Sequence, residues 1–297
     1  MNVLSLFDGV SCGRIALEKV GIKVNNYIAY EVDKNAIEIS KTNYPDIKHM
    51  GSVVGADFSE FEGYDLVIGG FPCQDLSIGQ HKGERSLNGE RSGLFWELVR
   101  AIEEVKPKYF LVENNFGMPK AAKDIITETL KVEPIMIDSQ LISGQRRKRL
   151  YWTNIKNVEV PEDKNIKFQD IVESGFVHTL KSYCLTANYT GAYPADLFKS
   201  VRSQVFEPNI NGKFTVKDGV VHIPGYKRVP GKEHVKVSLI PDGRYDIRPL
   251  NVKECCRLQT MPENYFDGFK ENASKKAMGN GWTIDVIAHI FKRLEEV

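Results

Sequence analysis

Short apolar runs alternate with helical patterns through the first half of the chain. The apolar runs predict buried strands at residues 3–6, 27–30, 66–68, 109–115, 135–138 and 149–153. Helices are predicted at residues 15–20, 34–42, 94–105, 252–258 and 283–294. Strands that alternate with helices are typical of α/β folds, in which helices cover a mostly parallel sheet. We therefore expect an α/β domain that binds its ligands at the carboxyl ends of its strands.

The pattern changes from about Asn157 onward. Helical periodicity fades, and Gly, Pro, Asn and Tyr surround short β-like runs at residues 214–216, 220–223 and 235–240. We expect residues 1–158 and 272–297 to form the α/β domain, and residues 159–271 to form a smaller, irregular, β-rich domain. Basic residues such as Lys181 and Arg228 alternate with tyrosines there, which suits contact with nucleic acid. A solvated surface explains this pattern nearly as well.

Composition narrows the class of protein. The 297 residues are 42% hydrophobic and 27% charged, as in an ordinary soluble domain, and no apolar run reaches the ~20 residues that span a bilayer. The first eight residues fit a strand better than a signal peptide, so we expect a cytoplasmic protein. We also expect the protein to be a monomer. The net charge of +1 excludes a globally basic nucleic-acid binder. Five cysteines without a CxxC pair support neither a disulfide framework nor a metal site.

Cys73 stands just after the third predicted strand, in a turn that Pro72 stiffens. This position puts a nucleophilic side chain where α/β proteins bind their substrates. Free cysteines are more often buried and inert, so position alone does not establish catalysis. Residues 74–93 follow with many Gly, Ser, Lys and Arg, and a loop of this length is either a mobile lid or a surface insertion.

Two further strands end in charged residues. Glu113 terminates an apolar run, where a carboxylate is costly unless it has a partner or a role, although a helix cap or a surface position is the simpler explanation. It would lie beside Cys73 if the two strands are neighbours. A cationic cluster at residues 145–149 leads into the last strand, so Arg149 should point along the same edge. Most charge runs are only solvated surfaces.

A glycine-bearing turn spans residues 7–13, and Glu31 stands at the tip of the second strand. Small residues let a ligand approach the backbone, and a carboxylate can accept hydrogen bonds from both ribose hydroxyls. This arrangement suits a nucleoside, but about half of such turns are only tight packing corners.

Taken in order, these pieces resemble the DNA (cytosine-5)-methyltransferase family over the whole chain except residues 160–245. The resemblance rests on six motifs: Phe7-Asp8-Gly9 with Gly13, Pro72-Cys73-Gln74, Glu113-Asn114-Asn115, Gln145-x-Arg147-x-Arg149, Arg248-Pro249-Leu250 with Glu254 and Arg257-Leu258-Gln259, and Gly279-Asn280-Gly281-Trp282. Details such as the tryptophan in the last motif lean toward the vertebrate de novo branch. The length is that of a stand-alone bacterial or phage enzyme, such as one of a restriction-modification system.

The resemblance implies a fold, a cofactor and a reaction. We expect a Rossmann-like large domain, with a mixed and mostly parallel sheet, that binds S-adenosylmethionine, and a smaller target-recognition domain that reads double-stranded DNA. Cys73 would attack C6 of a flipped-out cytosine, Glu113 would hold N3 and the exocyclic amine, Arg149 would hold O2, and Arg147 would steady the turn. The resemblance implies no metal. The expected setting is the cytoplasm of a bacterium or of a phage-infected host cell.

The same resemblance carries over the binding residues. The cofactor would contact Phe7, Asp8, Gly9, Gly13, Glu31, Val32, Phe71, Pro72, Leu94, Asn280 and Trp282. DNA would contact Gln74, Ser77, Arg85, Gln145, Lys181 and Arg228.

Two departures from the family pattern concern the adenine of the cofactor. Ser52 stands where the family has an Asp, with Asp57 nearby, and Val32 stands where many relatives have a Trp. Three other readings stay open: a tRNA cytosine-5 methyltransferase on the same scaffold, a non-catalytic DNA-binding homologue, and a nucleotide-binding oxidoreductase. The last explains neither Pro72-Cys73-Gln74 nor the basic second half.

Overall fold

The computed structural model describes residues 1–72, 93–189, 191, 202–222 and 237–294. Its contacts divide the chain into two compact units. The first contains residues 1–138, 148–161 and 282–297, and the second contains residues 139–147 and 162–281. Residues 139–147 and 272–281, which the sequence analysis placed in the large domain, therefore pack within the second unit.

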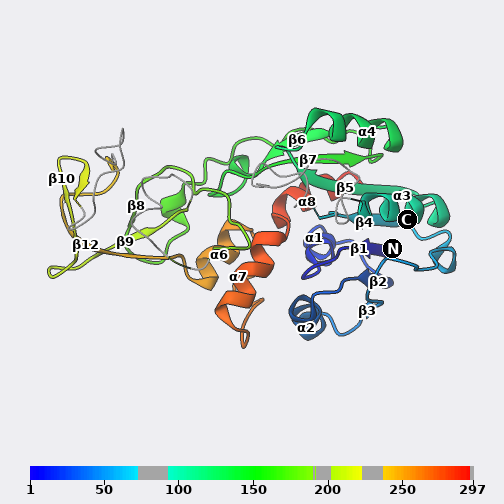
Figure 1. The fold of residues 1–297 in the computed structure, drawn as a ribbon, viewed down its shortest axis with the longest axis horizontal. Helices are drawn as coiled ribbons and strands as arrows, with labels where there is room; N and C mark the ends of the chain where they lie inside the picture. The colour runs from blue at the N-terminus through cyan, green and yellow to red at the C-terminus, as the bar shows by residue number, and fades with distance from the viewer. Residues whose placement is uncertain (73–92, 190, 192–201, 223–236, 295–297) are drawn as a thin grey trace. The chain divides into compact units, whose positions relative to one another are not determined.

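The first unit is built on a seven-stranded sheet with the order β3-β2-β1-β4-β5-β7-β6 (Figure 1). Its strands are β1 (Asn2–Leu6), β2 (Asn26–Tyr30), β3 (Lys48–His49), β4 (Leu66–Gly69), β5 (Tyr109–Asn115), β6 (Ile135–Asp138) and β7 (Lys148–Thr153). Six of these strands run in one direction, and β7 runs opposite to them. The mixed, mostly parallel sheet confirms the predicted fold class. Because β4 and β5 are paired, the ends of the strands before Cys73 and at Glu113 are neighbours, as predicted.

Helices pack against this sheet. They are α1 (Cys12–Lys19), α2 (Lys34–Asn43), α3 (Leu94–Val105), α4 (Lys120–Leu130) and α8 (Ile284–Phe291), with a 3-10 turn η1 (Ser59–Phe61). The buried face of α3 places Phe95 and Leu98 in the core against the strands. The last helix returns to the start of the chain, since α8 contacts α1, where the red and blue ends of the ribbon meet in Figure 1.

The second unit contains a five-stranded antiparallel sheet with the order β11-β10-β12-β9-β8. Its elements are η2 (Ser139–Leu141), η3 (Phe168–Asp170), β8 (Phe176–Val177), β9 (Val205–Pro208), β10 (Phe214–Lys217), β11 (Val220–His222), β12 (Gly243–Arg248), α6 (Val252–Leu258) and α7 (Glu271–Asn280). Phe206, Val216 and Tyr245 form its small core. A reciprocal cap begins α6, because Asn251 accepts from the Glu254 amide and Glu254 accepts from the Asn251 amide.

One predicted β-like run is not a strand where the structure describes it. In residues 237–240, the Ile240 amide donates to the Val237 carbonyl at 2.8 Å, which closes a turn. Both side chains are buried in the core of the second unit, so their apolar character reflects packing rather than a strand. Within the described ranges, no helix combines the length and apolarity needed to cross a membrane.

Candidate active site

The turn after β1 holds an unusual backbone shape. Phe7, Gly9 and Ser11 have φ angles of 57°, 61° and 58°, in the left-handed region that most residues avoid. At Phe7 and Ser11, which are not glycines, such conformations cost of order 1 kcal/mol or more, and strained residues of this kind concentrate at ligand sites. A Cβ on Gly9 would meet nothing within 4 Å, so the space beside it is open. The turn thus offers room for a ligand at the carboxyl end of β1.

Asp8 organises this turn from within. Its carboxylate is 8% exposed and accepts from the hydroxyls of Ser5 (2.5 Å), Tyr27 (2.8 Å) and Ser11 (2.6 Å). Burial, together with the Asp8 charge, raises the pKa of Tyr27 well above its ordinary value. The Ser11 hydroxyl lies 2.6 Å from that of Ser40, which links the turn to α2. Asp8, predicted to contact the cofactor, uses these acceptor sites to fix the turn.

Gly13 is required by close packing. A Cβ at this position would lie 2.2 Å from Cδ1 of Ile68 and 3.1 Å from the hydroxyl oxygen of Tyr27. Real Cβ atoms do not approach other atoms so closely, so a larger residue here would force the Ile68 side chain or the start of α1 to move.

Glu31 binds the turn from the neighbouring strand. One carboxylate oxygen accepts from the Gly9 amide at 2.8 Å, and the other accepts from the amides of Val32 and Asp33 at 2.7 Å each. A carboxylate has about four acceptor sites, so roughly one remains for a ligand in this arrangement. The next residue, Val32, is apolar, and 69% of its surface is exposed to solvent.

The two candidates for adenine contact have local partners. The Ser52 hydroxyl accepts from the Val54 amide at 3.1 Å. One Asp57 oxygen accepts from the amide and the hydroxyl of Ser59, and these bonds lower the pKa of Asp57. Both residues are exposed, so either could exchange a local bond for one to a ligand.

Glu113 and Arg149 meet at the carboxyl edge of the sheet. In the antiparallel pairing of β5 with β7, Glu113 faces Tyr151, so Arg149 two residues away lies on the same face. Nε of Arg149 is 2.8 Å from one oxygen of Glu113. The other oxygen accepts a hydrogen bond from Nε1 of Trp282 at 2.9 Å. The carboxylate is only 8% exposed and is therefore held on both sides.

The end of β4 approaches the same carboxylate. A Cβ on Gly70 would lie 2.9 Å from both Oε2 of Glu113 and Nε1 of Trp282. The next residue, Phe71, is buried against the ring of Phe95, and its carbonyl accepts from the side-chain amide of Asn114 at 3.1 Å. These contacts fix the backbone that leads to Cys73. Pro72 and Leu94, also predicted to contact the cofactor, are each partly exposed.

Predicted residues of the second unit have mainly internal partners. Gln145 has no exposed surface: it donates to the Leu258 carbonyl and the Gln259 side chain, and it accepts from the Leu185 amide. Arg147 is 4% exposed and donates to three carbonyls, those of Leu185, Gly279 and Gly281. The Lys181 ammonium donates to the carbonyls of Gln140 and Ser143. These contacts favour structural roles, whereas Asn280 is exposed at the end of α7.

Other predicted residues lie outside the described residues. They are Cys73, Gln74, Ser77, Arg85 and Arg228. Among the described residues, no group of three or more His, Cys, Asp or Glu side chains is arranged to hold a metal ion.

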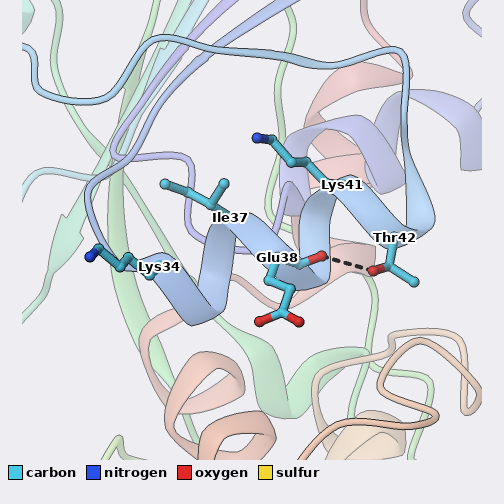
Figure 2. A pocket seen from close by; sticks show the side chains of 5 residues that line it. All are labelled: Lys34, Ile37, Glu38, Lys41 and Thr42. Atoms are coloured by element: carbon cyan, nitrogen blue, oxygen red, sulfur yellow. Dashed lines mark hydrogen bonds between the residues drawn. The ribbon is translucent and has the colours of Figure 1, made fainter.

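A surface depression lies elsewhere, on α2 (Figure 2). It has a volume of about 390 Å³ and is lined by Lys34, Ile37, Glu38, Lys41 and Thr42, with the Thr42 hydroxyl donating to the Glu38 carbonyl. All five residues belong to one helix, and none comes from a strand end. We therefore assign the active site to the strand edge rather than to this depression.

Sequence reasoning missed several residues that build the site. Tyr27 and Ser40 look like ordinary core and helix positions in the sequence, and Gly70 looks like half of a strand-ending pair. A polar hydroxyl at a buried strand or helix position was the available signal, because such groups need partners.

Comparisons with known proteins identify the family of the chain. The family model for C-5 cytosine-specific DNA methylases matches residues 1–296. The type II methyltransferase M.FnuDI of Fusobacterium nucleatum is 26% identical over 100% of this chain and 94% of its own. The type II methyltransferase M1.ScrFI of Lactococcus lactis subsp. cremoris is 25% identical over 100% of this chain and 78% of its own.

Solved structures show the same fold. The methyltransferase EhMeth of Entamoeba histolytica has a TM-score of 0.70 and 15% identity, covering 100% of this chain and 99% of its own. The Dnmt2 methyltransferase of S. pombe has a TM-score of 0.65 and 17% identity, covering 98% and 97%. With the family match across nearly the whole chain, the protein belongs to the C-5 cytosine-specific DNA methylase family and is a DNA (cytosine-5)-methyltransferase.

Proposed function

We propose that the protein methylates C5 of a cytosine that is flipped out of a specific sequence in duplex DNA, through a covalent bond between Cys73 and C6 of the base. The pair formed by Glu113 and Arg149 carries this proposal, with 2.8 Å between Nε and Oε1. It lies beside Gly70, which directly follows β4 and stands three residues before Cys73 in the sequence. A carboxylate and a guanidinium therefore lie near the strand end from which the chain continues to Cys73.

The pair suits the electronic demand of the reaction. Cytosine C5 is a weak nucleophile, and addition of the Cys73 thiolate to C6 moves electrons toward N3 and O2, which makes C5 nucleophilic. A proton shared between Glu113 and N3 can stabilise the negative charge that develops on N3, and the same carboxyl group can accept from the exocyclic amine. The Arg149 guanidinium can donate to O2 as negative charge develops there. The base then gains the methyl group at C5, loses the C5 proton to water and releases Cys73 by β-elimination.

The turn after β1 fits a bound S-adenosylmethionine. Open space beside Gly9, the remaining acceptor site of Glu31 and the exposed apolar Val32 match a ribose next to a flat ring. When bound, the cofactor supplies an electrophilic methyl group. The chain contributes a preformed turn, fixed by Asp8, that needs little ordering on binding.

The second unit is our candidate for target recognition. The target atom cannot be reached inside a duplex, so the base must leave the stack, and a separate unit is suited to read the flanking sequence from the major groove. Since Gln145 and Lys181 donate to groups within this unit, we expect its base contacts to come from other residues. We expect the enzyme to act as a monomer on double-stranded DNA.

Methylation of purified nucleic acids tests the proposal. The protein is incubated with tritiated S-adenosylmethionine and either plasmid DNA or tRNA, and methylated cytosines are mapped by bisulfite sequencing. We expect label in DNA at a recurring sequence. Label in tRNA alone would replace the DNA assignment with the rival activity.

The covalent step has its own test. Cys73→Ser should abolish methylation and also the trapping of the protein on duplex DNA that contains 5-fluorocytosine at the mapped site. Methylation by Cys73→Ser at the wild-type rate would refute the covalent mechanism.

A further inference from the structure

Trp282 occupies a position that the reaction alone does not explain. It follows the Gly279-Asn280-Gly281 motif, where the family pattern has valine, and it is only partly exposed. Its indole N–H donates to Oε2 of Glu113 at 2.9 Å, although the two residues are 169 positions apart. A valine could make no such bond.

The bond completes a two-sided hold on Glu113. Arg149 approaches Oε1 at 2.8 Å and Trp282 approaches Oε2 at 2.9 Å, so the plane of the carboxylate is defined by one donor on each oxygen. Hydrogen bonds to charged groups are among the stronger ones in proteins. About two acceptor sites of the carboxylate remain, one for a hydrogen of the exocyclic amine and one for a proton shared with N3 of the base.

Gly70 makes room for this arrangement. A Cβ at this position would lie 2.9 Å from Oε2 of Glu113 and 2.9 Å from Nε1 of Trp282. Both atoms are closer than a real Cβ tolerates, so any other residue would displace the carboxylate from the indole. The sequence thus provides the donor and also the space for the bond.

We propose that Trp282 is a positioning residue for Glu113: its indole N–H orients the carboxylate toward the exocyclic amine of cytosine, and Gly70 permits that contact. The inference rests on the proposed function. It assigns to Trp282 a role in selecting and activating the base, separate from any contact with the cofactor.

The contact itself can be tested without methylation. The three tryptophans of the chain give three indole resonances in a ¹H–¹⁵N spectrum, which single Trp→Phe variants assign. Glu113→Ala should move the Trp282 indole proton upfield and leave that of Trp152, which donates to Thr127 at 2.9 Å, unchanged. An unmoved Trp282 resonance would overturn the proposal, even if the enzyme methylates DNA.

The role is tested by kinetics of Trp282→Phe at the mapped DNA site. We expect the single-turnover rate at saturating DNA and cofactor to fall about tenfold, the effect of losing one hydrogen bond to a charged group. The dissociation constant for S-adenosylhomocysteine, measured by calorimetry, should stay within about twofold. The preference for cytosine over 2-pyrimidinone, which lacks the exocyclic amine, should fall about as much as the rate. Loss of cofactor affinity with unchanged base preference would overturn the proposal.

Two variants separate positioning from general damage. Gly70→Ala keeps the indole but displaces the carboxylate, so it should reproduce the loss of base preference. Trp152→Phe removes an indole hydrogen bond of the same length that joins β7 to α4, and it should keep the wild-type preference. If Trp152→Phe lowered the preference as much as Trp282→Phe does, the effect would be structural and the proposal wrong. If the wild-type protein methylated neither DNA nor tRNA, the proposed function would fail, while the indole resonance would still decide whether the contact exists.

Discussion

His178 makes the second unit sensitive to acid. The side chain follows β8 and is 9% exposed, and neither ring nitrogen has a hydrogen-bond partner among the described residues. The centroid of the His178 ring lies 6.1 Å from the ring centroids of both Tyr183 and Phe206. Burial lowers the pKa of His178 from 6.5 to about 4. The folded unit therefore holds this imidazole neutral over a range where an unfolded chain would protonate it.

The sign of the effect follows from proton linkage. Because the unfolded state binds the proton more tightly, stability is full above pH 6.5 and falls as the pH drops toward 4. Each tenfold difference in proton affinity corresponds to about 1.4 kcal/mol, so the full loss is about 3 kcal/mol. Between pH 7 and pH 5 the free energy of unfolding should fall by about 2 kcal/mol, a large share of the stability of a small unit.

Hydrogen exchange measures this loss in the right part of the protein. Tryptophan fluorescence would report on the first unit, which contains all three tryptophans, whereas the backbone amides of β9 and β12 report on the second. Protection of those amides is compared at pH 7 and pH 5 in the wild type and in His178→Phe, whose ring suits the apolar surroundings. The variant should lose about 2 kcal/mol less than the wild type. Equal losses, or an imidazole that titrates near pH 6.5 by NMR, would refute the reasoning.

Three substitutions probe close packing and buried hydrogen bonds in the two units. Gly13→Ala should lower stability by about 1–3 kcal/mol and weaken cofactor binding in calorimetry, because its Cβ would lie 2.2 Å from an isoleucine Cδ1 in β4. Tyr27→Phe should cost about 1–3 kcal/mol in thermal unfolding, since it removes a donor from the buried carboxylate of Asp8. Arg248→Ala should lower the free energy of unfolding by about 3 kcal/mol, measured by urea unfolding followed by circular dichroism. The reason is that Glu254, which has no exposed surface, loses two hydrogen bonds of 2.8 Å. Little change in any of the three variants would show that the contact in question is dispensable.

The sequence predicts elements well where burial imposes a strong pattern. The predicted and observed bounds coincide for α3 (Leu94–Val105) and β5 (Tyr109–Asn115), which bury a continuous apolar face or run. It misses α4 (Lys120–Leu130), in which only Ala122 and Ile126 are buried. A helix that packs lightly leaves little hydrophobic signal, because most of its surface faces solvent.

Strands of the second unit are hidden for a related reason. In β12 (Gly243–Arg248) only Tyr245 is buried, and the strand exists because its backbone pairs with β9 and β10. The β-strand propensity of a segment predicts little where its pairing depends on strands far away in the sequence. For this reason the sequence predicts a β-rich character for this region but not its five-stranded order.

The active site divides in the same way. Strand ends at one sheet edge predict that Glu113 and Arg149 share a face, and the structure places them together. No pattern in the sequence predicts the bond from Trp282, because the contact depends on how the last segment of the chain returns to the sheet. Residues that act through geometry across long sequence separations must be found in three dimensions.

The segment Gln145–Arg149 shows how one motif serves both units. Gln145 and Arg147 are buried in the second unit, where Arg147 donates to carbonyls at the end of α7. A cation at a helix carboxyl end is favourable there, since it meets the negative end of the helix dipole. Arg149 belongs to the first unit and pairs with Glu113. The two arginines of the motif therefore have different roles. Loss of Arg147 should lower the stability of the second unit. Loss of Arg149 should slow methyl transfer in a protein that remains folded.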